Sequence, residues 1–322
     1  MKTLDDNHLQ TQFGILGGVV SFSCYENGEP KDVMLSEKNM ILTHAGELVP
    51  FYTETHRRKH KSSVTFHRNG LVKSVSLEQQ QEIMTPIGEF PAELVTFYET
   101  GELNRFFPLD GKIDGFWTEK DERELNIPFN FELEFGSISA MLVGICFYKS
   151  GEIKSLSLFP EEIITLNAPC GEVKVKNGFS LFEDGRLHSL EPAVPVRVDT
   201  PIGKINAFDT QAIGITADSC SLAFDESNRI SSLITSSDRI AVTMPDGSFK
   251  SFSPVKKTSP LDDESEITIG IKVSFNYDEK TVTITEEDEF TFSYDECSFS
   301  IVKGFMRSGC NPQDCAGCPG CH

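Results

Sequence analysis

Apolar and polar residues alternate on either side of a turn that recurs six times along the chain. Each copy has an aromatic or apolar residue, or Cys, four positions before a Gly or Asn. These segments are Cys24–Gly28, Phe66–Gly70, Phe97–Gly101, Phe147–Gly151, Leu181–Gly185 and Phe224–Asn228. Because Gly and Asn accept the positive φ of a tight hairpin, each copy predicts two short strands joined by a turn.

The strand that follows each turn keeps the alternation. Five residues beyond the turn residue, every copy has an apolar side chain: Val33, Val75, Phe106, Leu156, Leu190 or Leu233. The preceding position is Ser in four copies: Ser74, Ser155, Ser189 and Ser232. Abundant Phe, with many Val, Ile and Thr residues, favours strands in the same way.

A second turn follows most copies and ends in Gly. It occupies Thr85–Gly88, Ala168–Gly171, Thr200–Gly203 and Met244–Gly247, with a looser version at Thr43–Gly46. The distance from the first turn to the second is 18 residues in three copies, 19 in one and 20 in one. This register predicts units of two linked hairpins added side by side. The predicted fold class is therefore all-β, with antiparallel β-hairpin repeats that form an elongated sheet or solenoid.

The segment Phe97–Trp117, with the recurring aromatic-x-x-Gly-x-Leu turn, resembles the MORN-type β-hairpin repeats. The resemblance implies an elongated antiparallel sheet, in one layer or wrapped, that is used for protein or lipid contact. It implies no catalytic residue.

Four regions are predicted. Residues 1–253 form the repeat body, and 254–266, rich in Pro, Ser and charge, form a linker. Residues 267–303 form a small strand meander with a turn at Tyr277–Lys280, and 304–322 form a Cys-rich tail. The one predicted helix is Thr118–Leu125.

The charge and the apolar runs limit the classes of partner. The chain has 322 residues and a formal net charge of −20, from 49 acidic and 29 basic residues. This charge argues against binding to nucleic acid or to an anionic membrane, and it favours a basic protein partner. No secretory signal is visible, and the longest apolar runs are about half of the ~20 residues that a membrane helix needs. We expect a cytoplasmic protein with reduced thiols.

The tail contains the one spacing that predicts chemistry, C-x4-C-x2-C-x2-C, formed by Cys310, Cys315, Cys318 and Cys321. Four thiolates this close, separated by Gly and Pro, predict an iron–sulfur cluster or a soft metal such as zinc. The run Cys315–Cys321 resembles the ferredoxin element that holds a 4Fe-4S cluster, whereas the C-x4-C-x2-C part resembles plant-type ferredoxin spacing, so the cluster type stays open. His322 is a candidate substitute ligand.

Other interpretations of the tail stay open at this point. Zinc knuckles are normally separated, whereas these share Cys318. Cys318–His322 satisfies the haem-attachment pattern C-x-x-C-H, and Cys-Pro-Gly-Cys resembles thioredoxin-like dithiols. A disordered, reduced tail that binds nothing is the remaining alternative.

The other candidate residues are interpreted as structural. Five further cysteines occupy or adjoin apolar positions: Cys24, Cys146, Cys170, Cys220 and Cys297. The basic segment Thr55–Lys61 is expected to be a solvated hairpin loop, with contact to an anion or an acidic partner as the alternative. His67 and His188 adjoin turns and are expected to be exposed.

No catalytic constellation is recognisable, so the sequence favours a non-enzymatic role without deciding it. The first prediction is a cytoplasmic scaffold or accessory protein whose tail carries a cluster or soft metal. The alternatives are a redox or electron-transfer protein that acts through the tail, and a plain protein-interaction module with a non-functional tail.

Overall fold

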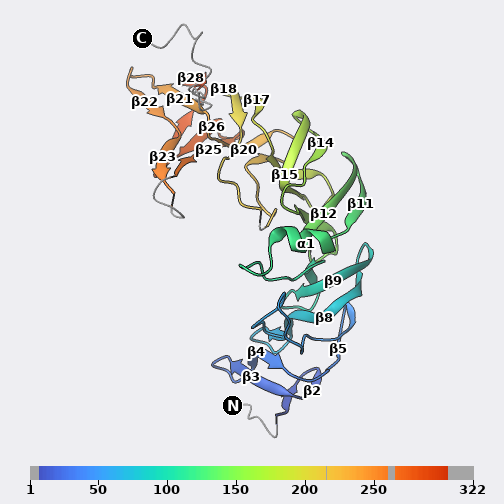
Figure 1. The fold of residues 1–322 in the computed structure, drawn as a ribbon. Coiled ribbons are helices and arrows are strands. Elements are labelled where there is room, and N and C mark those ends of the chain that lie inside the picture. The colour runs from blue at the N-terminus through green and yellow to red at the C-terminus, as the bar shows by residue number, and fades with distance from the viewer. Residues whose placement is uncertain (1–6, 215, 260–264, 304–322) are drawn as a thin grey trace. The chain divides into compact units, whose positions relative to one another are not determined.

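The computed structural model describes residues 7–214, 216–259 and 265–303 (Figure 1). Within these ranges the chain is all-β, with one short helix, and every ladder between two strands is antiparallel. The predicted all-β, antiparallel class is therefore confirmed. No helix in the described part of the chain is long and apolar enough to cross a membrane.

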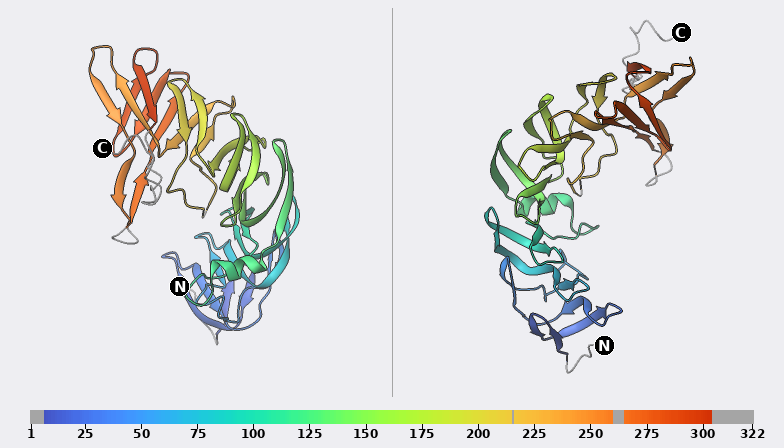
Figure 2. Two further views of the ribbon diagram at one scale, coloured as in Figure 1. Left: turned by 45° about the horizontal axis from the view of Figure 1, so that its top comes forward. Right: turned by 180° about the vertical axis from the view of Figure 1, so that it is seen from behind.

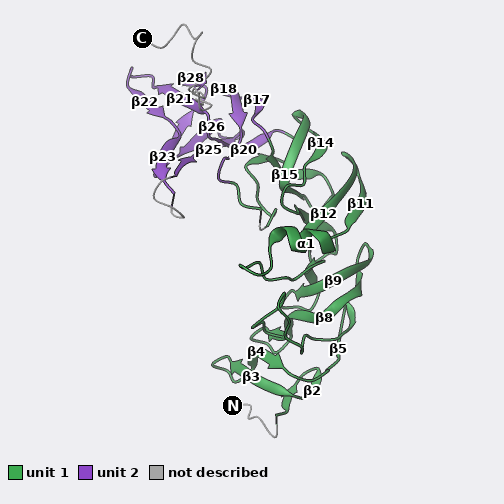
Figure 3. Ribbon diagram, in the orientation of Figure 1, with its two compact units in different colours: residues 1–193, 212–228 green, residues 194–211, 229–322 purple. Residues whose placement is uncertain are grey.

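The chain divides into two compact units (Figure 3). Unit 1 comprises Met1–Ala193 and Ala212–Asn228, and unit 2 comprises Val194–Gln211 and Arg229–His322.

Unit 1 is built on one continuous antiparallel sheet, of which β3, β4, β8, β9, β12 and β15 are labelled in Figure 1; Figure 2 shows the chain from two further sides. In spatial order they are β3 (Val19–Cys24), β4 (Pro30–Leu35), β7 (Val64–Phe66), β8 (Val72–Thr85), β9 (Gly88–Phe97), β10 (Leu103–Phe107), β12 (Gly136–Phe147), β13 (Ile153–Leu158), β15 (Gly171–Leu181), β16 (Leu187–Pro192) and β19 (Leu222–Phe224). Each strand pairs with the next in this order.

A row of directly opposed apolar residues crosses this sheet. It consists of Val33, Val64, Val75, Val95, Phe106, Ile145, Leu156, Phe179, Leu190 and Leu222. All ten side chains are 0% exposed. The row contains every apolar residue that the sequence places five positions after a turn in this unit, so one cross-strand line forms the core.

The neighbouring positions face the other side of the sheet, and half of them are Ser or Thr. Segment 216–221 covers part of this polar face. The hydroxyl of Ser157 accepts from the Ala217 N–H at 3.1 Å, and that of Ser189 accepts from the Cys220 N–H at 3.2 Å. Arg105 donates to both carboxylate oxygens of Asp218 at 2.7 Å. These contacts explain why residues Ala212–Asn228 belong to unit 1.

The recurring turns share one hydrogen-bond pattern. In the first, the Gly28 N–H donates to the Tyr25 carbonyl at 2.9 Å, and the Tyr25 N–H donates to the Glu29 carbonyl at 2.8 Å. The same two bonds recur in the turns that end at Gly70, Gly101, Gly151 and Gly185. All five glycines have φ between +82° and +99°, the region that the sequence pattern predicts.

Side chains of the turns also link each hairpin to the next. The hydroxyl of Tyr25 donates to the Phe66 carbonyl at 2.9 Å, and that of Tyr98 donates to the Phe147 carbonyl at 2.7 Å. Tyr148 bonds the Leu181 carbonyl in the same way at 2.8 Å, and a ring nitrogen of His67 lies 2.9 Å from the Phe97 carbonyl.

The two histidines beside turns are not exposed, which corrects the expectation for both. The side chain of His67 is 13% exposed because of the bond to the next hairpin. His188 is half-buried against the Phe182 ring and lies 3.1 Å from the Ser180 hydroxyl. Burial, with a smaller contribution from Lys154, lowers the pKa of His188.

Outer hairpins carry the second set of turns. In unit 1 they are β1 (Leu9–Thr11) with β2 (Gly14–Leu16), β5 (Ile41–Thr43) with β6 (Gly46–Leu48), the distal halves of β8 and β9, β11 (Pro128–Leu133) with β12, and β14 (Ile164–Ala168) with β15. In the turns Thr11–Gly14, Thr43–Gly46 and Thr85–Gly88, the Thr hydroxyl donates to the Gly carbonyl. The Thr11–Gly14 turn was not predicted.

The predicted helix is confirmed as α1 (Glu119–Leu125) in unit 1. Thr118 caps it: its hydroxyl accepts from the Asp121 N–H, and its own N–H donates to the Asp121 carboxylate at 2.8 Å. This reciprocal capping box fixes the first turn and leaves Glu122 buried.

Unit 2 contains the remaining strands. They are β17 (Val196–Thr200), β18 (Gly203–Ala207), β20 (Ile230–Thr235), β21 (Asp238–Thr243), β22 (Phe249–Phe252), β23 (Val255–Thr258), β24 (Glu266–Ile269), β25 (Ile271–Asn276), β26 (Thr281–Thr285), β27 (Glu289–Ser293) and β28 (Ser298–Lys303). β25, β26 and β27 form a meander, in which the predicted turn separates β25 from β26. β23, inside the segment predicted as a linker, pairs with β24.

Two glycine-to-alanine substitutions distinguish the stability lost to backbone strain from the stability lost to a steric clash between hairpins. Gly151 (φ +97°) lies under the tip of the β8–β9 hairpin, where an added Cβ would come within 2.9 Å of the Pro86 Cβ. Gly185 (φ +87°) has open space. We expect Gly185→Ala to destabilise unit 1 by about 1 kcal/mol and Gly151→Ala by about 2 kcal/mol or more, measured by urea denaturation. Equal losses would contradict this contact between hairpin tip and turn.

Candidate functional site

The predicted metal ligands cannot be placed. Cys310, Cys315, Cys318, Cys321 and His322 lie outside the described residues, so ligation stays a prediction. Within the part of the chain that the structure does describe, no group of three or more His, Cys, Asp or Glu side chains is arranged to hold a metal ion.

The five other cysteines are free thiols in the structure. Cys146 is buried and the other four are half-buried. Burial raises the pKa of Cys220 to about 12 and also raises the pKa values of Cys146 and Cys170. A thiol that stays protonated is a poor nucleophile and a poor metal ligand, which fits the structural role predicted for these cysteines.

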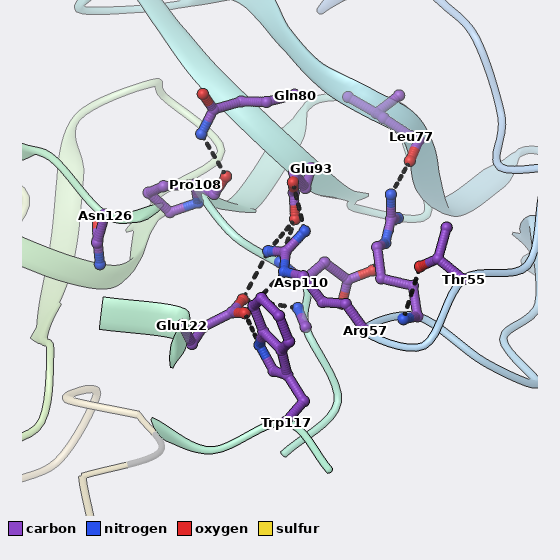
Figure 4. Close-up of polar contacts among 12 residues, drawn as sticks. Thr55, Arg57, Leu77, Gln80, Glu93, Pro108, Asp110, Trp117, Glu122 and Asn126 are labelled. Carbon is purple, nitrogen blue, oxygen red and sulfur yellow. Dashed lines mark hydrogen bonds and ion pairs between the residues drawn. The ribbon is translucent and has the colours of Figure 1, made fainter. Parts of the chain in front are cut away.

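The basic segment Thr55–Lys61 is a loop that is only partly solvated: Thr55, His56 and His60 are exposed, but Arg57 is half-buried and Arg58 is buried. Figure 4 shows Arg57 between two carboxylates. Its guanidinium donates to both oxygens of Glu93 on β9 at 2.7 and 2.8 Å, and to both oxygens of Glu122 on α1 at 2.7 Å. Trp117 adds a bond from its ring N–H to Glu122 at 2.6 Å. The expectation of a solvated loop is wrong for Arg57 and Arg58, because this part of the loop folds against the sheet and α1.

The ion pairs and hydrogen bonds of this cluster determine the pKa values of Glu122 and Arg57. Burial alone would raise the pKa of Glu122, but the bonds from Arg57, Trp117 and the Gly111 N–H outweigh it and lower that pKa. Burial likewise opposes the charge of Arg57, and the two carboxylates raise its pKa above the usual value. Both groups therefore stay charged near neutrality.

Arg58 is also buried, at 4% exposure. It stacks on the Phe51 ring at 4.6 Å, donates to the Leu77 carbonyl and pairs with Asp110 at 3.3 Å. Lys61 pairs with the same carboxylate. Each carboxylate of this cluster thus pairs with a cation: Glu93 and Glu122 with Arg57, and Asp110 with Arg58 and Lys61. These ion pairs hold the loop Thr55–Lys61 and α1 against the sheet. We call the cluster of Arg57, Arg58, Lys61, Glu93, Asp110 and Glu122 the brace.

Two apolar pockets lie between the tips of the outer hairpins of unit 1. The first, about 430 Å³, lies between Phe13 of one tip and Leu42 and His44 of the next, with Val72 and Phe97 in its lining. The second, about 390 Å³, lies between His44 and the tip that carries Met84 and Pro86, with Leu103 and Tyr148 in its lining. We call the two pockets together the tip groove.

His44 is the wall between the two pockets. Its Nδ1 lies 2.9 Å from the Gly101 carbonyl, so the tip of one outer hairpin is tied to a turn of the central sheet. Leu42 beside it is 70% exposed and Met84 is 54% exposed. Apolar side chains exposed next to apolar pockets are typical of a binding surface.

Carboxylates adjoin the tip groove. Glu102 lines the second pocket, and Glu99, whose side chain is 79% exposed, belongs to the turn whose Thr100 and Gly101 line the first. A hydrogen bond from Thr100, with weaker effects of Lys149 and His44, lowers the pKa of Glu102 and keeps it ionised. The surroundings of the tip groove are thus acidic, with Lys149 as a counter-charge.

Comparison of the chain with known protein families, with curated proteins and with solved structures finds no match. Sequence reasoning did not find the tip groove. The signal that was available is the Thr-x-x-Gly pattern of its tips, at Thr11–Gly14, Thr43–Gly46 and Thr85–Gly88.

We expect Arg57→Leu to destabilise unit 1 by about 3–5 kcal/mol at pH 7, because Glu93 and Glu122 would be left buried without a cation. In the parent, the lowered pKa of Glu122 gives stability that is present above its unfolded pKa and is lost as the pH falls through the folded pKa. In the variant, unpaired burial would raise that pKa, so protonation would restore stability on acidification. The difference in the free energy of unfolding between the parent and Arg57→Leu, measured by urea denaturation, should therefore become smaller from pH 7 to pH 5.

The control for this variant is Lys31→Leu, which removes an exposed pair with Asp32 at 3.9 Å. We expect it to change stability by less than about 0.5 kcal/mol. If Arg57→Leu were equally mild, or if its deficit grew on acidification, Arg57 would not neutralise buried carboxylates.

Proposed function

We propose that this chain is a cytoplasmic accessory protein with two functional regions, the body and the tail. The body docks a protein partner through the tip groove of unit 1. The tail binds an iron–sulfur cluster or a soft metal such as zinc through Cys310, Cys315, Cys318 and Cys321, with His322 as a substitute ligand. The observation that carries the docking role is the pair of apolar pockets with exposed Leu42 and Met84 beside them.

The architecture proposed for the body is a stack of β-hairpin repeats that forms an elongated sheet or solenoid and resembles the MORN-type repeats. Support comes from the shared hydrogen-bond pattern of the turns and from the ten opposed apolar residues of the central row. An acidic body of this kind suits a basic protein partner and not nucleic acid or an anionic membrane.

The proposal places the chemistry in the tail. The raised pKa values of Cys146, Cys170 and Cys220 make these body thiols poor ligands. The spacing of the tail cysteines is the remaining source of clustered thiolates. A redox or electron-transfer role at the same cluster is the second candidate, and it would require a cluster that survives reduction and reoxidation.

The test is anaerobic purification followed by iron, zinc and acid-labile sulfide analysis and a visible spectrum. The full chain is compared with a chain truncated after Gly309. We expect near-stoichiometric iron and sulfide, or zinc, in the full chain and its loss on truncation, because the four thiolates are the ligands.

The matched variants are Cys315→Ser/Cys318→Ser, which should lose the metal, and Cys24→Ser/Cys297→Ser, which should keep it. A full chain free of iron and zinc under reducing, oxygen-free conditions would refute the tail half of the proposal.

A further inference from the structure

The two pockets of the tip groove repeat with the period of the sheet. The first lies over the turns that contain Leu71 and Gly101, and the second over the turns that contain Glu102 and Gly151. Consecutive turns are one hairpin apart. Because paired strands lie about 4.8 Å apart, one hairpin step moves a pocket by about 9.6 Å. A ligand that fills both pockets must present two apolar groups with this spacing.

A polyproline II segment has this spacing. It contains three residues per turn with a rise of about 3.1 Å, so residues i and i+3 lie on one face about 9.3 Å apart. The two residues between them point away from that face, which leaves room for the His44 wall between the pockets. The aromatic side chains in the lining, Phe13, Phe97 and Tyr148, are those that grooves for polyproline II ligands use.

Other secondary structures fit less well. A β-strand repeats its side chains on one face about every 6.7 Å, which is out of step with the pockets. A helix brings residues i and i+7 about 10.5 Å apart, but residues i+3 and i+4 lie on the same face and would meet His44.

The charge around the tip groove favours particular residues on either side of the two apolar residues of the ligand. Glu99 and Glu102 carry carboxylates beside the pockets, and acidic residues outnumber basic ones in unit 1 as a whole. A second copy of this chain, with a net charge of −20, would be repelled. Lys or Arg residues in the ligand would be attracted.

Building on the docking role proposed above, we propose that the tip groove binds a basic, proline-containing segment of a partner protein in the polyproline II conformation. Large apolar residues at positions i and i+3 enter the two pockets, and flanking Lys or Arg residues face Glu99 and Glu102.

The test uses two fluorescein-labelled peptides of equal composition, with binding followed by fluorescence anisotropy on the full, reduced chain. Lys-Leu-Pro-Pro-Leu-Pro-Lys places its Leu residues at i and i+3, and Lys-Leu-Pro-Leu-Pro-Pro-Lys places them at i and i+2. We expect the first to bind about tenfold more tightly, because one Leu of the second cannot reach its pocket. Added salt should weaken its binding.

Two exposed substitutions test the pockets separately. Leu42→Asp in the first pocket and Met84→Asp beside the second should each weaken the i, i+3 peptide about tenfold. Ile163→Asp is the matched control, because Ile163 is 59% exposed on the same unit and lines neither pocket. It should leave the affinity unchanged.

The outcomes separate this inference from the docking role on which it rests. Equal binding of the two peptides, lost in Leu42→Asp and Met84→Asp, would overturn the polyproline II register and leave the tip groove as a docking site. Binding that Ile163→Asp weakens as much as the pocket variants do, or no binding of either peptide, would overturn the inference itself. The metal content of the tail is measured in a separate experiment, and none of these binding results depends on it.

Discussion

The structure of unit 1 depends on the row of apolar side chains that runs directly across its sheet, from Val33 to Leu222. Each strand of the sheet except β3 contributes one fully buried residue to this row, and a buried side chain of this size is worth about 1.5–3 kcal/mol. A slip of one residue in any hairpin would turn its contribution to the Ser- and Thr-rich face. The row therefore fixes the register of the hairpins of the central sheet, and their Gly turns and the Tyr bonds to the next carbonyl follow from that register.

The same register produces the proposed site. Because the central turns stand in line, the outer hairpins that cover them also come at even steps, and the gaps between their tips become pockets with a common period. His44, bonded to the Gly101 carbonyl, holds one tip in place. The ion pairs of Arg57 fix a different part of the unit, where the loop Thr55–Lys61 and α1 lie against β9. Binding and stability are thus assigned to separate groups of residues.

Much of this fold could be predicted from the sequence, because turn residues and alternation are local signals. Local signals of this kind predict three features: the recurring Gly turns, the apolar residues five positions after them and the capped helix that follows Thr118. Long-range pairing could not be predicted: Arg57 meets carboxylates 36 and 65 residues away. The Thr11–Gly14 turn contains no Pro and follows no Gly turn, so it does not match the recurring pattern. The tip groove depends on which tip covers which turn, and only the fold decides that.

Native-state hydrogen exchange of the full chain tests the central row most directly. If the row is the core of unit 1, the amides of Val75, Phe106 and Leu156 should exchange together, through the global unfolding of this unit. The amides of the exposed tip around Leu42 and Glu47 should exchange faster, through local opening. Fast or unrelated exchange along the row would contradict the account, because the hairpins would then be independent elements and not one stack.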